Sequence, residues 1–587
     1  GVENTIVGAL TGDALTDADY NVAIGVQALS TDTKGSKSTA IGNQTLYLQN
    51  FATATDSFNT AVGYQAGKSV TTGIQNTLIG GLAGDAITTG NNNVAVGKSS
   101  LSANTTGAGN NALGSSALLS NTTGATNTAL GHTSMNQNTT GSNNVAVGSG
   151  SLANNTTAAN NTAVGLSALF ANTTGTTNTA VGYAALDANT TAGSNTAVGS
   201  SALGANTTGA NNTAVGANSL LVSTTGLDNV AVGNLALTAN TTASYGTAVG
   251  KSALAANTTG ANNTGLGFKA LTANTTGQYN TAVGTNAGDA ITTGNSNTML
   301  GFNSGGATTT AGQNVAVGQS TLTTNTTGSF NTAIGAEALL SNTTAANNTA
   351  VGYNSLTANT TAANNTAVGF EALKANTTGA TNTAVGANAG DAITTGVANT
   401  LLGYLAGTYL TNLTTGGTNT LIGAFNKTNA ADSTFAIGLG YNLVCTSGYT
   451  TLGANTSDIR AAHGTATWAA VSDERYKKDI VDSTAGLSFI NALQPRTWKY
   501  KTLGELPETF SAYEEGSTEV FKNTQTNHGF IAQEIKAAID ADSSIADGFK
   551  LWDDRDDGSQ EVAEAALIPV LVKAIQELTA RLETLEG

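Results

Sequence analysis

The segment Asn-Thr-Ala-Val-Gly recurs along most of the chain at steps of 17 residues, for example at Asn161 and again at Asn178. The register holds for about 25 copies between Asn4 and Asn419, with a four-residue insertion before Asn59 and a three-residue insertion before Asn419. A fixed period of this length is the sequence signature of a solenoid, in which each repeat forms one coil and stacks on the next. The repeat therefore predicts a mostly β fold, a parallel β-solenoid of about 25 coils over residues 1–430.

Two positions of the repeat are nearly invariant when the copies are compared with one another. The fifth position is glycine in every copy, and the fourth is always Val, Ile or Leu. A short β-branched segment closed by an obligatory glycine indicates a strand followed by a turn that needs positive φ or close backbone approach. A coil of 17 residues has room for two such strands and two turns.

The first position is asparagine in all copies but two, which carry Ser38 and Gly246. Asparagine side chains can hydrogen-bond backbone groups of a turn. We therefore expect a stacked asparagine ladder that satisfies turn backbone from coil to coil.

The remaining positions come in two forms that place the large apolar residue differently. In one form it stands at position nine, as Leu169, and in the other position nine is Gly288 and the bulk moves to position twelve, as Ile291. This compensation indicates a packed solenoid rather than a disordered tract. At roughly 4.8 Å per coil the rod would be on the order of 120 Å long. Because a Val, a Leu or Ile and a few alanines make a thin core, we expect several chains to associate along their strands.

Units of the type Asn-[Ser/Thr]-x-Ala-[Ile/Val]-Gly resemble the head repeats of trimeric bacterial adhesins, a left-handed parallel β-roll, and the shafts of marine phage tail fibres. The resemblance implies a trimeric β-roll, although the unit here is 17 residues long and the adhesin unit is shorter.

The repeat array offers little material for catalysis or for metal binding. His132 stands alone, and the acidic residues are scattered rather than paired as glycosidases require. Aspartates of the second coil form are expected to cap turns rather than to bind a cation (Asp13, Asp85, Asp289 and Asp391). We predict no enzymatic activity for the shaft, no metal and no cofactor.

The net charge of −16 gives no basic surface for nucleic acid or for an anionic membrane. The sequence contains no apolar run of the roughly 20 residues that a membrane span needs, and a single cysteine, Cys445, excludes an intrachain disulfide framework. We therefore expect neither nucleic acid binding nor membrane insertion. Because the first residue is Gly1 rather than Met, an upstream part is expected to be missing.

The 17-residue step is lost over residues 431–471, where aromatic residues become frequent. We interpret this segment as the distal cap of the rod, with Tyr441, Tyr449 and Trp468 as candidates for contact with a receptor. The alternative is that these aromatics form a hydrophobic layer over the last coil.

Ser472 opens a segment of different composition, which holds 34 of the 58 charged residues and all three prolines. A serine hydroxyl becomes a nucleophile when a base removes its proton, and a neutral lysine amine such as that of Lys477 can do so. Because a spacing of five places the two side chains on different faces of a helix or a strand, they can meet only across a turn or between chains.

The order of motifs in this segment resembles the peptidase S74 family, the intramolecular chaperones of phage tail spikes, fibres and endosialidases. The motifs are Ser-Asp-x-Arg-x-Lys-x-Asp-Ile from Ser472, Leu-Gln-Pro and Trp-Lys-Tyr from Leu493 to Tyr500, and Gly-Phe-Ile-Ala-Gln-Glu ending at Glu534. The resemblance implies a small α+β chaperone over residues 472–587 that gathers three chains and then cuts itself off between Val471 and Ser472. It implies Ser472 as nucleophile and Lys477 as general base; His528 and Glu534 are auxiliary candidates.

Two amphipathic helices are predicted in this segment, at residues 529–539 and 562–585. In the second, apolar residues step by four and three and form a seam that needs partner helices: Leu571, Ile575, Leu578, Leu582 and Leu585. The alternative is a single helix packed on its own domain.

The sequence thus predicts a homotrimeric phage tail-fibre protein with a self-cleaving C-terminal chaperone, assembled in the bacterial cytoplasm and carried on the virion. Its expected partners are its own copies, other tail proteins and a receptor or glycan of the host surface. The alternative from another class is a bacterial cell-surface adhesin or stalk that is not cleaved and ends in a trimerisation cap. A polysaccharide depolymerase and an ice-binding solenoid are minor alternatives.

Overall fold

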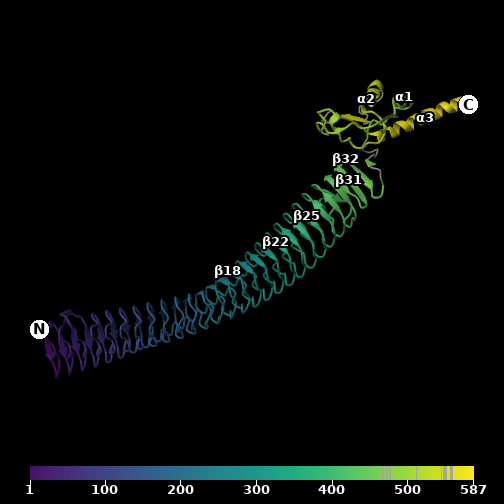
Figure 1. The fold of residues 1–587 in the computed structure, drawn as a ribbon. Coiled ribbons are helices and arrows are strands. Elements are labelled where there is room, and N and C mark those ends of the chain that lie inside the picture. The colour runs from purple at the N-terminus through teal and green to yellow at the C-terminus, as the bar shows by residue number, and fades with distance from the viewer. Residues whose placement is uncertain are drawn as a thin grey trace. The chain divides into compact units, whose positions relative to one another are not determined.

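The computed structural model describes residues 1–455, 457–465, 469–470, 474, 477–510, 512–543, 545, 551–554 and 559–587. The chain divides into two compact units, Gly1–Val471 and Ser472–Gly587. The first unit is a parallel β-solenoid of about 26 turns, which confirms the predicted fold class (Figure 1).

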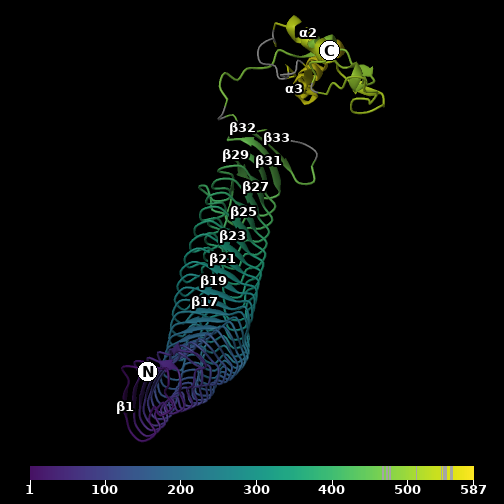
Figure 2. The ribbon, with the colours of Figure 1, turned by 60° about the vertical axis from the view of Figure 1, so that its left-hand side comes forward.

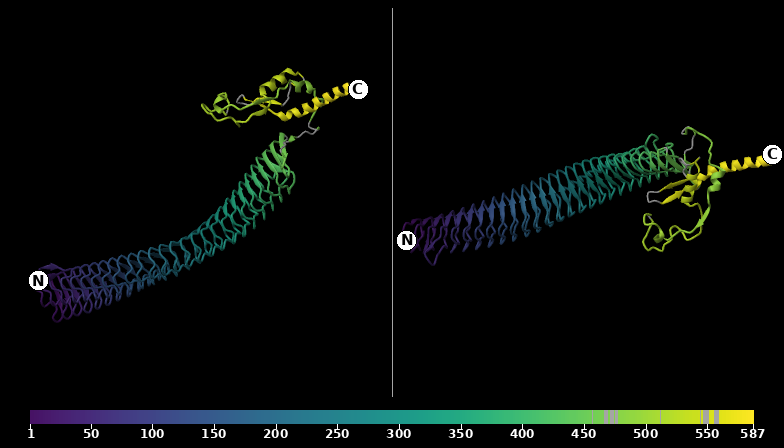
Figure 3. Two further views of the ribbon diagram at one scale, coloured as in Figure 1. Left: turned by 45° about the vertical axis from the view of Figure 1, so that its right-hand side comes forward. Right: turned by 90° about the horizontal axis from the view of Figure 1, so that it is seen from above.

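Each coil contributes one three-residue strand, at positions two to four, which pairs in register with the strand of the next coil. Figures 2 and 3 show the coils stacked side by side, with the strands on one side of the rod. The strands are β1 (Thr5–Val7), β2 (Val22–Ile24), β4 (Thr39–Ile41), β6 (Thr60–Val62), β7 (Thr77–Ile79), β8 (Val94–Val96), β9 (Asn111–Leu113), β10 (Thr128–Leu130), β11 (Val145–Val147), β12 (Thr162–Val164), β13 (Thr179–Val181), β14 (Thr196–Val198), β15 (Thr213–Val215), β16 (Val230–Val232), β17 (Thr247–Val249), β18 (Thr264–Leu266), β19 (Thr281–Val283), β20 (Thr298–Leu300), β21 (Val315–Val317), β22 (Thr332–Ile334), β23 (Thr349–Val351), β24 (Thr366–Val368), β25 (Thr383–Val385), β26 (Thr400–Leu402) and β27 (Thr420–Ile422).

The room for a second strand is used for turns instead. In the coil that begins at Asn161, Ser167, Leu169 and Thr177 have φ of 55°, 52° and 58°. These left-handed residues bend the chain too tightly for strand pairing. The coil is therefore one short strand closed by a long, tightly turned segment.

The strand buries its middle residue and exposes the other two. In β12, Ala163 is fully buried, whereas Thr162 and Val164 point outward and are partly exposed. Successive side chains of a strand alternate between faces, so a three-residue strand has only one inward position. The expectation that the valine fills the core was wrong: alanine fills it, and the Val, Ile or Leu of position four lies on the surface.

The predicted asparagine ladder at position one is confirmed. The backbone N–H of Asn161 donates to Oδ1 of Asn144 in the coil before (3.0 Å), and its own Nδ2 donates to the carbonyl of Gly175 (2.9 Å). The side chain of Asn161 is completely buried. Each amide therefore satisfies backbone groups that the turn would otherwise leave unpaired inside the coil.

A second asparagine ladder, not predicted from the sequence, runs through position twelve. Nδ2 of Asn172 donates to Oδ1 of Asn155 (3.0 Å) and to the carbonyl of Gly175 (3.0 Å), and Asn172 is fully buried. The ladder breaks where position twelve is apolar, at Ile291 and Ile393, and the Oδ1 atoms of the preceding rungs, Asn274 and Asn376, then have no hydrogen-bond partner.

The predicted compensation between positions nine and twelve is also confirmed. Leu169 and Ile291 are both fully buried in their coils. A Cβ added to Gly288 would lie 3.0 Å from Cδ1 of Ile291, so the missing side chain at position nine is the space that the isoleucine occupies. The two coil forms fill one core in two ways.

This compensation predicts a strong coupling between two substitutions in one coil. Leu169→Gly alone should destabilise the coil by about 2–5 kcal/mol through cavity formation. Asn172→Ile alone should overpack the site and break the ladder. In the double variant the isoleucine fills the cavity, so we expect a favourable coupling of roughly 1–3 kcal/mol in a double-mutant cycle on thermal unfolding. Additive losses would contradict this account of the core.

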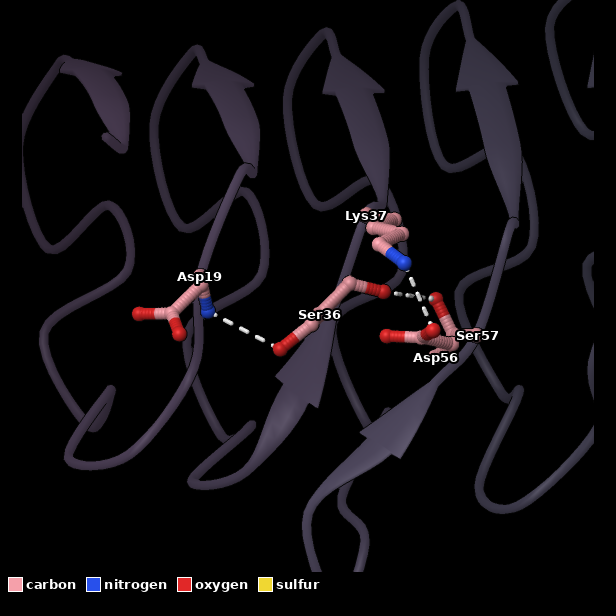
Figure 4. A network of polar contacts seen from close by, with 5 residues as sticks. All are labelled: Asp19, Ser36, Lys37, Asp56 and Ser57. Carbon is pink, nitrogen blue, oxygen red and sulfur yellow. Dashed lines mark hydrogen bonds and ion pairs between the residues drawn. The ribbon is translucent and has the colours of Figure 1, made fainter. Parts of the chain in front are cut away.

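The four-residue insertion before Asn59 is accommodated by an extra strand pair, β3 (Gly35–Ser36) with β5 (Thr55–Asp56), which are parallel. Figure 4 shows the polar contacts around it: the hydroxyl of Ser36 accepts from the Asp19 N–H (2.9 Å), and Nζ of Lys37 lies 2.6 Å from Oδ2 of Asp56. Ser57 donates its hydroxyl to the Ser36 carbonyl (3.1 Å). The insertion thus bulges outward without breaking the register of the main strands.

The solenoid ends in a short antiparallel extension. Strand β29 (Ile437–Tyr441) continues the parallel stack from β27 to β31 (Tyr449–Ala454), beside the smaller parallel pair β28 (Lys427–Thr428) and β30 (Val444–Cys445). Strands β32 (Ser457–Ala462) and β33 (Ala469–Ala470) then pair antiparallel to this end of the sheet. Reversal of strand direction stops the stacking of further coils on this edge.

The second unit is a small α+β domain. Its elements are α1 (Leu487–Ala492), β34 (Arg496–Trp498), η2 (Leu503–Glu505), β35 (Asn527–Gly529), α2 (Ala532–Ala541), β36 (Trp552–Asp554), β37 (Gln560–Val562), η3 (Glu564–Ala566) and α3 (Leu567–Glu586). Among the described residues β34 pairs antiparallel with β35 and β36 with β37. Phe489, Ile535, Leu551 and Val570 lie in its core.

Both predicted helices exist but start later than expected. Gly529 belongs to β35 and pairs with Arg496, so α2 begins at Ala532. Val562 belongs to β37 and pairs with Trp552, so α3 begins at Leu567, with Pro569 in its first turn. Proline is tolerated there because the first N–H groups of a helix have no intrahelical acceptor.

Candidate functional site

The predicted nucleophile and scissile bond, Ser472 and Val471, lie outside the described residues. In the described part of the segment, the N–H of Lys477 donates to the carbonyl of Glu474, three residues earlier (2.9 Å). Lys477 itself is exposed. A turn between positions 472 and 477 is what the spacing of the predicted dyad requires, because a regular helix or strand would separate the two side chains.

The two later motifs of the segment pack against each other through β34 and β35. Trp498 stands opposite Asn527, and a Cβ on Gly529 would lie 2.9 Å from the Trp498 ring. Glycine is therefore needed at 529 for close approach to the indole. His528, one of the two auxiliary candidates, stands in the same strand opposite Thr497 and is exposed.

Glu534, the other auxiliary candidate, is engaged by Arg496. The guanidinium donates from Nε to Oε2 (2.9 Å) and from Nη2 to Oε1 (2.7 Å), which ties β34 to the first turn of α2. These hydrogen bonds lower the pKa of Glu534 and raise that of Arg496. The carboxylate is thus held ionised as a hydrogen-bond acceptor, and it would have to leave Arg496 to orient a water molecule or a lysine.

Helix α3 is buried in the domain over its first two turns and exposed at its apolar seam. Leu567, Val570 and Ala574 are buried, and the Glu577 carboxylate accepts from the N–H of Leu487 at the start of α1 (2.8 Å). The predicted seam is exposed along its whole length, at Leu571 (42%), Ile575 (61%), Leu578 (45%), Leu582 (56%) and Leu585 (84%). The helix therefore packs on its own domain and still leaves the predicted seam uncovered in the single chain.

The aspartates of the shaft accept hydrogen bonds from the protein. Asp13 accepts from Ser30 (2.8 Å), Asp85 from Ser102 (2.5 Å) and Asp391 from Nδ2 of Asn388 (3.2 Å). Burial raises the pKa of Asp289. Within the described ranges, no group of three or more His, Cys, Asp or Glu is placed to hold a metal ion.

The end of the solenoid carries an aromatic cluster that sequence reasoning found only in part. Phe425 lies edge-to-face with Tyr404, Tyr409 and Tyr441, at centroid distances of 5.3, 4.8 and 5.7 Å. Tyr441 was predicted as a contact residue, whereas the other three were missed. The available signal was the three-residue insertion before Asn419, which brings Tyr409 into the cluster.

The other two predicted contact residues differ in their placement. Tyr449 lies in β31 under the guanidinium of Arg460, whose carbon is 5.4 Å from the ring centroid. Trp468 lies outside the described residues. Burial raises the pKa of the Cys445 thiol to about 12, so the one cysteine of the chain is a packing residue and not a nucleophile. In the part of the chain that the structure describes, we find no helix with the length and apolar composition of a bilayer span.

Comparison with known proteins gives a family match within the second unit. Residues 472–542 match the family model Peptidase_S74, described as the chaperone of endosialidase. Searches of curated proteins and of solved structures found no match. The match begins at the residue where the second compact unit begins. The chain therefore carries a Peptidase_S74 chaperone-of-endosialidase domain behind a β-solenoid of 17-residue coils.

Proposed function

We propose that the chain is the subunit of a homotrimeric phage tail fibre that attaches the virion to its host. Its C-terminal domain gathers three chains, and autoproteolysis between Val471 and Ser472 then releases that domain. The observation that carries the proposal is the chaperone-of-endosialidase match, which starts at Ser472 directly after the solenoid unit. Assembly takes place in the bacterial cytoplasm, and other tail proteins hold the fibre on the virion.

The chemistry of release follows from the position of the serine after the bond. The Ser472 hydroxyl oxygen attacks the Val471 carbonyl carbon while its proton passes to the neutral Lys477 amine. The peptide C–N bond then breaks, the freed Ser472 nitrogen takes a proton, and an ester joins the two residues. Water hydrolyses this ester to the Val471 carboxylate and restores the hydroxyl.

Exposure of Lys477 in the single chain fits a reaction that waits for assembly. A lysine amine can act as a base only in its neutral form, and burial favours that form because it disfavours the charged ammonium. Covering the turn at 474–477 by a neighbouring subunit would supply that burial. Cleavage would then follow trimerisation rather than precede it.

The seam of α3 supports the association of three chains. Five apolar side chains at steps of four and three stay exposed, from Leu571 to Leu585, although residues beside them in the first two turns of the helix are buried in the domain. Leucine and isoleucine at such spacing pack as knobs into the holes of partner helices. A second copy of the same helix presents the complementary seam.

The strand face of the solenoid gives independent support. Position four is Val, Ile or Leu in every coil and is at least partly exposed, reaching 46% for Leu113 and 45% for Leu266, and no charged residue stands at position two or four in any copy. A contiguous apolar column that runs through successive coils is the kind of exposed surface that marks an interaction site. A partner that covers it must repeat at the same spacing, and another copy of this chain does.

The mass of the purified wild-type product tests the proposal. We expect a trimer of chains that end at Val471 and a separate 116-residue fragment that begins with Ser472. Mass spectrometry of the denatured sample gives the cut, and light scattering of the native sample gives the subunit number. A full-length trimer would contradict self-release and favour an uncleaved surface adhesin or stalk; a monomer would contradict the assembly.

A further inference from the structure

We propose that the aromatic cluster at the end of the solenoid is a binding site for a saccharide that carries a carboxylate. The cluster consists of Tyr404, Tyr409, Phe425, Tyr441 and the ammonium of Lys427. The inference deepens the proposed function, since it names the chemistry of the host surface that the fibre would recognise.

The rings come from three successive coils and are fixed by the backbone ladder. The Phe425 N–H donates to the carbonyl of Tyr404 in the coil before (2.9 Å). The Asn442 N–H donates to the carbonyl of Ala424 (2.9 Å), and this bond holds Tyr441 beside Phe425. Tyr404 and Tyr441 are half exposed, at 49% and 50%. The result is a rigid aromatic surface with its phenylalanine in the middle and tyrosines around it.

The three-residue insertion builds the fourth side of this surface. Its loop leaves the coil at Gly407 and returns at Leu413, where the Leu413 N–H donates to the Gly407 carbonyl (2.9 Å) and closes the neck. Tyr409 folds from this loop onto Phe425, and Leu410 beside it is 78% exposed. Leu413 fills the coil core and Thr408 is buried, whereas Tyr409 and Leu410 of the same loop reach the surface.

The polar groups around the rings match a sugar better than an apolar peptide. Within the described residues, the structure gives no hydrogen-bond partner to the hydroxyls of Tyr404, Tyr409 and Tyr441. An apolar side chain laid on the cluster would bury those hydroxyls unpaired, at a cost of about 1–3 kcal/mol each. A pyranose instead presents C–H groups to the ring faces and hydroxyls to the tyrosine hydroxyls.

Lys427 supplies the preference for a carboxylate. Its Nζ lies 5.1 Å from the centroid of the Tyr409 ring, and no carboxylate among the described residues forms an ion pair with it. Another ring pair of the shaft, Tyr353 stacked on Phe370, lies near Lys374, whose ammonium is paired with Glu371 at 2.8 Å. Only 9 basic and 15 acidic residues stand before Ser472, so the shaft repels an acidic sugar weakly.

Calorimetric titration of the purified wild-type protein tests the site. The probes are an oligosaccharide of alternating glucuronic acid and N-acetylglucosamine, the same compound with its carboxylates reduced to alcohols, and a sialic-acid oligosaccharide. We expect at least one of the two acidic probes to bind. If the glucuronic-acid oligosaccharide binds, its affinity should be about tenfold higher than that of its reduced form. Tyr409→Ala should abolish binding, and Lys427→Met should remove the preference for the acid while leaving binding of the reduced compound.

Tyr353→Ala is the matched control, because it removes a half-exposed ring from the same solenoid and should leave the affinity unchanged. The proposal is overturned if no acidic probe binds at millimolar concentration, or if Tyr409→Ala binds like the wild type. Recognition of an apolar peptide in place of the sugars would also overturn it. Subunit number and cleavage are measured on the same samples, so failure of this site and failure of the fibre assignment give different results.

Discussion

Replacing Ser472 with alanine is expected to stop release of the C-terminal domain completely, so that only the full-length chain is recovered. Without the hydroxyl oxygen of residue 472 no ester can form, and an alanine side chain offers no other nucleophile. Because the substitution leaves α3 and the strand face intact, the uncut protein should still be a trimer. Denaturing gels and mass spectrometry measure the cut, and light scattering measures the trimer.

Substitutions at Lys477 and at its neighbour Lys478 test whether Lys477 is the general base. Lys477→Ala and Lys477→Arg should both stay uncut, since a guanidinium keeps its charge and cannot take the serine proton. Lys478→Ala is the control: it removes an adjacent exposed ammonium and should be cut like the wild type. Ready cleavage of the Ser472→Ala variant at the same bond would disprove the dyad.

A single methyl group on the shaft, in Gly182→Ala, is expected to disrupt several coils. Gly182 has a φ of 139°, and a Cβ on it would lie 2.5 Å from the carbonyl oxygen of Gly199 in the next coil. The left-handed backbone alone costs about 1–3 kcal/mol for a non-glycine residue. The clash with backbone adds to this, because neither coil can move without breaking its ladder. We expect a loss of roughly 3 kcal/mol or more and faster amide hydrogen exchange in the neighbouring coils.

Gly204→Ala provides the comparison for this variant. Gly204 lies in the turned segment of the next coil, at position ten, where other coils carry larger residues, and a Cβ there would meet its neighbours at 3.4 Å or more. Its stability should stay within about 0.5 kcal/mol of the wild type. Equal effects of the two substitutions would show that the glycine of position five is not required by close approach.

Sequence periodicity was sufficient for the solenoid because each coil repeats the same constraints. The glycine of position five is required because the backbone of the next coil approaches it closely. The asparagine of position one is required because its side chain hydrogen-bonds backbone groups of the turn. Both constraints act in every coil. The same periodicity could not show which strand residues face inward. Alanine and valine alternate at positions three and four, and hydrophobicity alone favours burial of the valine.

Local backbone preferences of single residues also failed to predict the conformation of the turns. Leu169 and its equivalents adopt positive φ, which a bulky residue avoids in isolation. The conformation persists because the leucine side chain is buried between stacked coils, a contact that exists only once the neighbouring coils are formed. The second asparagine ladder was not predicted because the Asn-Thr-Thr segment has the composition of an exposed polar turn. Its asparagine becomes buried only when the neighbouring coils are in place.

By itself, the sequence determined the coil length, the close-packed glycine column, the first asparagine ladder and the boundary at Ser472, because each of these depends on residues close in sequence or on strict repetition. Only the tertiary structure decided the direction of the strand side chains, the second ladder and the assembly of the aromatic cluster. These features depend on which coil stacks on which, and on the one space that remains inside a coil after its neighbours are in place.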